Sequence, residues 1–100
     1  MKTIINTQTN IDFEENSEIK KMSYFDFIKL IINAPSKEGY NVEEIRQRLQ
    51  ILEIININKE NSIIEFELNH FTLIKNSINS FKWVQIHKDI VMFIDYINSI

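Results

Sequence analysis

The chain has one glycine and one proline, and both lie in a single short stretch, Ala34–Tyr40. Because these two residue types interrupt helices and strands most strongly, this stretch is the clearest predicted loop. Glycine-rich phosphate-binding loops need several glycines whose backbone amides approach the ligand. A Walker loop and a dinucleotide-binding fingerprint are therefore both excluded.

Composition predicts one folded domain of 100 residues with 44% hydrophobic and 25% charged residues. There is no cysteine, so disulfides and thiolate metal sites are excluded. The formal net charge of −3 and the lack of a basic stripe argue against binding to nucleic acid. The N-terminus is polar and no apolar run is long enough to span a bilayer. The sequence therefore predicts a chain that is neither secreted nor inserted in a membrane.

Four segments predict helices from their start signals and apolar spacing. Ser23 and Asp26 form a capping-box pattern, Asn41 and Asn69 are candidate N-caps, and a last helix begins near His87. The expected inward faces are Tyr24, Phe27, Ile28 and Ile31; Val42, Ile45, Leu49 and Leu52; Phe71, Ile74, Ile78 and Phe81; and Ile90, Phe93, Ile94 and Ile97.

Residues 62–67 predict a short strand between the second and third helices. Its partner is expected to be the N-terminal segment or the same segment of another subunit. Within residues 1–21, segments 3–5 and 10–13 predict either a hairpin around residues 6–9 or an arm that orders on a partner. The expected fold is α+β, with residues 1–21 as hairpin or arm and residues 22–100 as one helical domain.

Residues 56–67 have the spacing of an EF-hand calcium loop. Asn56, Asn58, Glu60 and Glu67 stand at ligand positions, but the first lacks a carboxylate and Asn61 replaces the glycine that makes the turn. The pattern favours a metal-free connection, with calcium binding as the alternative.

No group of residues indicates catalysis or a cofactor. His70 and His87 belong to no metal-ligand motif, and the adjacent pairs Glu14–Glu15 and Glu43–Glu44 point in different directions on regular structure. The serines lack a nucleophile-elbow context. We therefore expect a protein that is not an enzyme and needs no cofactor or metal.

Apolar side chains exceed what one amphipathic stripe requires in the second and last helices. Self-association or a permanent protein partner would cover them, although an unusually buried second helix would also do so. Trp83 is either an interface anchor or, by preference, a core plug between the last two helices. The candidate interface consists of Ile51, Ile54, Ile55, Trp83, Val91 and Met92.

The segments 42–52, 63–68, 71–75 and 89–95 together resemble small proteins of tailed bacteriophages and prophages. The shared pattern is an extended N-terminus, a helix with an Arg-x-Arg stretch and a Leu-Lys helix after a Glu-rich strand. The resemblance implies a phage-type protein. Together with the apolar excess on the second and last helices, the unpaired strand and the extended N-terminal segment, it favours a homo-oligomeric interaction protein in virion assembly or structure, located in the bacterial cytoplasm or the virion. The alternative is an inhibitor or modulator of a host protein, suggested by the acidic residues Asp12, Glu14, Glu15 and Glu18.

Overall fold

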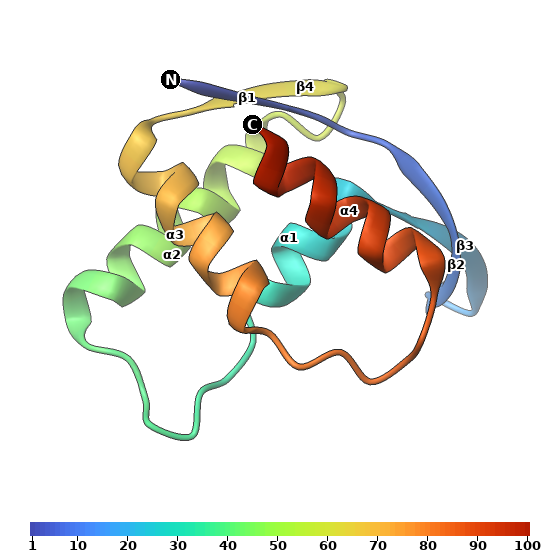
Figure 1. The fold of residues 1–100 in the computed structure, drawn as a ribbon, viewed down its shortest axis with the longest axis horizontal. Coiled ribbons are helices and arrows are strands. Elements are labelled where there is room, and N and C mark those ends of the chain that lie inside the picture. Colours follow the sequence, from blue (N-terminus) through green and yellow to red (C-terminus); the bar gives the residue numbers. More distant parts are fainter.

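The computed structural model describes residues 1–100, which fold into four helices and four strands (Figure 1). The elements are, in chain order, β1 (Lys2–Ile5), β2 (Gln8–Glu15), β3 (Glu18–Ser23), α1 (Tyr24–Ile32), α2 (Val42–Ile57), β4 (Ile63–Phe66), α3 (Leu68–Ser80) and α4 (Lys88–Ser99). The predicted α+β class and the four helices are confirmed. No helix combines the length and the apolar character needed to cross a membrane.

The N-terminal strand β1 and the strand β4 form a two-stranded antiparallel sheet, although nearly 60 residues separate them in the chain. In this register Ile4 lies opposite Ile64, and both side chains are buried. Figure 1 shows this sheet lying across one end of the helices. Of the two partners expected for the strand of residues 62–67, the structure therefore has the N-terminal segment of the same chain.

The hairpin of the N-terminal region differs from the prediction. β2 pairs with β3, and Asn16 and Ser17 form the two-residue turn with φ of 53° and 67°. Positive φ at both turn residues matches the twist of the strands, and asparagine tolerates it better than most residues. Residues 6–9, predicted as the turn, instead link β1 to β2, and the predicted boundary at residues 21 and 22 lies inside β3.

α1 begins with the predicted capping box. The Ser23 hydroxyl accepts a hydrogen bond from the Asp26 amide, and the Asp26 carboxylate accepts one from the Ser23 amide. Six of its nine residues are buried, which makes α1 the centre of the core. It ends at Ile32, shortly before Pro35, as predicted.

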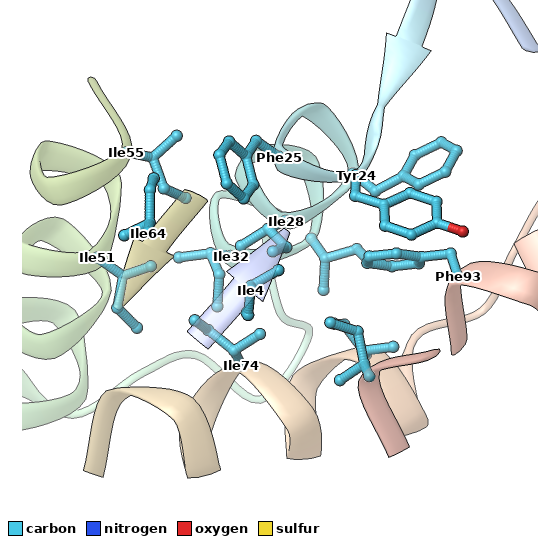
Figure 2. Close-up of a cluster of buried hydrophobic side chains, with 14 of the residues drawn as sticks. Ile4, Tyr24, Phe25, Ile28, Ile32, Ile51, Ile55, Ile64, Ile74 and Phe93 are labelled. Atoms are coloured by element: carbon cyan, nitrogen blue, oxygen red, sulfur yellow. The ribbon is translucent and has the colours of Figure 1, made fainter. Parts of the chain in front are cut away.

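α2 begins after its predicted cap, Asn41, but it is rotated by about a third of a turn from the predicted orientation. The structure buries Ile51 and Ile55, which point toward β1, β4 and α1 (Figure 2). Val42, Ile45 and Leu49, predicted to face inward, are exposed, and Leu52 is half-buried. Because both sides of α2 are apolar, periodicity could not decide which side packs inward.

α3 and α4 pack their predicted faces into the core, with Phe71, Ile74 and Ile78 buried in α3 and Ile90, Phe93 and Ile97 buried in α4. His87 is the N-cap of α4, but the predicted cap of α3 is wrong. Glu67 takes that place without a side-chain hydrogen bond, and Asn69 lies inside the helix. Since β4 ends at Phe66, the chain turns into α3 before it reaches Asn69.

Candidate interaction surfaces

The side chains of the calcium-loop pattern serve the local fold. Asn56 lies within α2, whereas Asn58 donates to the Ile54 carbonyl and accepts from the Asn61 side chain. Residues 63–66 are taken up by β4, which pairs with β1. No three His, Asp or Glu side chains of the chain are grouped closely enough to hold a metal ion. In the structure the segment forms a helix–turn–strand–helix connection.

The two histidines lie in different surroundings and do not meet. His70 is buried in the first turn of α3, where its Nε2 lies 3.0 Å from the Gln50 side-chain oxygen. His87 caps α4, with its Nδ1 accepting from the Asp89 amide at 3.0 Å. Each imidazole therefore has a structural role at a helix start.

A polar cluster ties α4 to the N-terminal strands. The Asp89 carboxylate accepts from the Asn10 amide at 2.9 Å, and the Tyr96 hydroxyl accepts from the Ile5 amide at 2.8 Å. Tyr24 lies beside this cluster, and its pKa is raised by burial first and then by the charge of Asp89 and by Tyr96. These groups hold backbone amides that no neighbouring strand pairs with.

The largest cavity, about 370 Å³, lies between the Ala34–Tyr40 loop and α3. Arg48 is its most prominent charged group, but this guanidinium is already bonded to Glu44, the Ile32 carbonyl and the Ser77 hydroxyl, and it lies over the Tyr40 ring. An arginine with these partners has few donors left for a ligand. Arg48 thus fixes α2 against α1 and α3.

The segment between α3 and α4 displays apolar side chains to solvent. Trp83 packs its ring edge-to-face against Phe27, Phe81 and Phe93, with centroids 5.6, 5.1 and 6.3 Å away. The preferred interpretation of Trp83 as a plug agrees with this packing. The next apolar residues, Val84 and Ile86, are fully exposed.

Beside this segment lies an apolar hollow of about 210 Å³ between α1, the β2–β3 hairpin and the start of α4. The exposed side chain of Leu30 lies at its border, and Met22, Phe27 and Trp83 line it. We call Leu30, Val84, Ile86 and this hollow the linker surface.

A second exposed apolar surface runs along α2. Val42, Ile45 and Leu49 are exposed and Leu52 is half-buried beside them. We call these four residues the outer stripe of α2. It was missed as a surface because its spacing is that of a core-facing helix.

The candidate interface residues predicted from sequence are scattered. Ile51 and Ile55 are core residues, so they are corrected from interface to interior. Ile54 and Trp83 are half-buried, and only Val91 and Met92 of α4 are exposed. The exposed surfaces instead carry the outer stripe and the linker residues, whose exposure no sequence pattern indicated.

The acidic residues of the hairpin are partly neutralised. Asp12 pairs with Lys21 and Glu15 with Lys20 across β2 and β3. Exposed ion pairs of this kind contribute little to stability, but they reduce the local negative field. Glu14 and Glu18 remain outside these pairs.

Comparisons of the chain with protein-family models, with curated proteins and with solved structures find no match. The exposed surfaces described above therefore supply the evidence for function. The linker surface and the outer stripe of α2 present exposed apolar side chains that a partner could contact, and the folded core fixes their positions.

Proposed function

We propose that this chain is a non-enzymatic interaction protein that binds a protein partner through the linker surface. The observation that carries the proposal is the full exposure of Val84, which lines an apolar hollow, and of Ile86, two residues further along the same segment. A single exposed aliphatic residue is ordinary, but a group of them around a hollow is typical of an interaction site.

The energetics favour a partner on this surface. Burying an aliphatic side chain of this size contributes about 1.5–3 kcal/mol. The segment that presents Val84 and Ile86 is anchored at one end by the Trp83 ring and at the other by the His87 cap of α4. Anchoring lowers the conformational entropy lost on binding.

The size of the hollow indicates what enters it. Ligand pockets for drug-sized molecules have volumes of about 300–1,000 Å³, whereas this hollow measures about 210 Å³. One large apolar side chain of a partner suits it better than a cofactor. The surface accordingly supports protein binding over small-molecule binding.

The resemblance to small proteins of tailed phages supports a role in virion assembly or structure, with a phage protein as the partner. Inhibition of a host protein is the alternative. The ion pairs of Asp12 and Glu15 weaken it, because they withdraw part of the acidic surface on which it depends.

A pull-down with the tagged chain from host cells, with and without phage genes expressed, tests the proposal. Wild type is expected to capture a partner that the double variant Val84→Ser/Ile86→Ser loses. Val91→Ser, a similar change on exposed α4, should still capture it. Thermal unfolding should be nearly unchanged in both variants, because all three side chains lie in solvent.

Capture of virion or assembly proteins would support the phage role, and capture of one host enzyme would support the inhibitor alternative. Equal capture by wild type and the double variant would contradict binding through the linker surface.

A further inference from the structure

We propose that two copies of this chain associate through the outer stripe of α2, with the two α2 helices antiparallel about a twofold axis near Leu49. This interface uses different residues from the linker surface and does not depend on the function proposed for it. Three observations carry the inference: the spacing of the stripe, the charges beside it and the immobility of the helix.

The outer stripe has the spacing of a helix–helix seam. Val42, Ile45, Leu49 and Leu52 follow one another at intervals of three, four and three residues, which is the a and d pattern of packed helices. Their exposed fractions are 65% for Val42, 42% for Ile45 and 59% for Leu49. Leu52, at the end of the stripe, is half-buried and packs partly against the core.

Two exposed charges flank the stripe on one side. Arg46 comes three residues before Leu49 and Glu53 four residues after it, and neither forms an ion pair within the chain. A twofold interface must be self-complementary, so that residue i of one copy contacts residue j of the other and the reverse.

The antiparallel arrangement meets this condition. It brings Arg46 of each copy near Glu53 of the other copy, giving two opposite-charge contacts around Leu49. A parallel twofold arrangement would instead place the flanking charges of the two copies on opposite sides of the seam, where Arg46 of one copy could not reach Glu53 of the other. The charge order along α2 therefore selects one orientation.

The helix cannot turn its stripe inward to avoid solvent. Arg48 holds α2 through the Ile32 carbonyl and the Ser77 hydroxyl, at 2.9 and 3.1 Å, and Ile51 and Ile55 are locked in the core. The exposure of the stripe is thus a fixed property of the fold, and covering it requires another molecule.

The expected dimer is small. The 16 residues of α2 span about 24 Å, and interfaces of limited area give weak, concentration-dependent association. We expect a dissociation constant in the range of about 1–100 μM, which sedimentation velocity measures directly when the protein concentration is varied across that range.

Charge variants test the pairing. Arg46→Glu alone and Glu53→Arg alone place like charges in both contacts, so each should raise the dissociation constant about tenfold or more. An equimolar mixture of the two variants should recover dimer, because each contact then joins an acidic side chain of one variant to a basic side chain of the other. The double variant Arg46→Glu/Glu53→Arg should also recover it.

Leu49→Asp should abolish the dimer, whereas Val91→Asp, at an equally exposed helical position, should leave it intact. Far-UV circular dichroism confirms that both variants fold. A wild type that stays monomeric up to about 500 μM, about five times the upper limit expected above, would overturn the proposal. So would a dimer that survives Leu49→Asp, or charge variants that fail to associate when mixed.

Discussion

The helices α1 and α2 contain similar numbers of apolar residues, seven and eight, but differ in how many of them are buried. α1 buries six of its nine residues, whereas α2 buries two of sixteen. α1 is packed against α2, α3 and β3, and α2 is packed on its inner side only. The difference teaches that the position of a helix in the packing, more than its residue types, decides whether an isoleucine or leucine is buried.

The largest effect is expected from a cavity in α1, the helix at the centre of the core. Phe27 is buried at the centre of α1, and its ring lies 5.0 Å from that of Phe93. Phe27→Ala should lower the free energy of unfolding by about 3–5 kcal/mol, as measured by urea denaturation. Leu30→Ala, at an exposed position of the same helix, should cost less than about 1 kcal/mol. Similar losses in the two variants would contradict the central burial of Phe27.

The two sides of α2 provide the second test. Ile51→Ala should cost about 2–5 kcal/mol, because it opens a cavity against β1, β4 and α1. Leu49→Ala should cost less than about 1 kcal/mol when measured at concentrations low enough to keep the chain monomeric. If Leu49→Ala cost more than Ile51→Ala, the orientation of α2 would be the one predicted from sequence.

The helices were predictable from the helical spacing of their apolar residues, and three of the four also from a correct start signal. Ser23 and Asp26 located α1, and Asn41 and His87 marked the beginnings of α2 and α4. The rotation of α2 was not predictable, because Val42 and Ile51 lie half a turn apart on the helix and are equally apolar. Which side of α2 faces the core is decided by tertiary packing.

The strands were harder to predict because their pairing is nonlocal. The turn at Asn16 and Ser17 contains no glycine, so the usual sign of a two-residue hairpin was absent. The pairing of β1 with β4 was one of two alternatives left open, and the burial of Ile4 opposite Ile64 explains the outcome.

The sequence predicted that apolar residues are exposed, but in α2 and between α3 and α4 it did not predict which residues they are. An apolar excess on α2 was visible in the sequence, but its exposed part is the outer stripe and not Ile51 and Ile55. The exposure of Val84 and Ile86 depends on how the linker crosses from α3 to α4. Apolar residues in an irregular segment carry no periodicity that indicates which way they face.

The N-caps give a smaller contrast between the same helices. Ser23→Ala should cost about 1–2 kcal/mol, because it removes the acceptor for the Asp26 amide at a partly buried helix start. Asn41→Ala should cost about 0.5–1 kcal/mol, because the Glu44 amide that it caps is exposed to water. Thermal unfolding of both variants measures the difference. A larger loss for Asn41→Ala would show that α2 depends more on its cap than α1 does.

The smallest effect concerns the first residue of α1 at alkaline pH. Burial and the Asp89 charge raise the pKa of Tyr24 above the usual tyrosine value of about 10. Below that pH the phenol is protonated in both the folded and the unfolded chain. As the pH rises past about 10, the unfolded chain loses this proton first, so the free energy of unfolding falls.

Tyr24→Phe removes this contribution of the phenol to the pH dependence of stability. Urea denaturation between pH 8 and 11 should therefore show a steeper loss of stability in wild type than in Tyr24→Phe. Parallel profiles of unfolding free energy against pH would contradict the burial of this phenol near Asp89. They would also contradict the contrast between the buried first residue of α1 and the exposed first residue of α2, Val42.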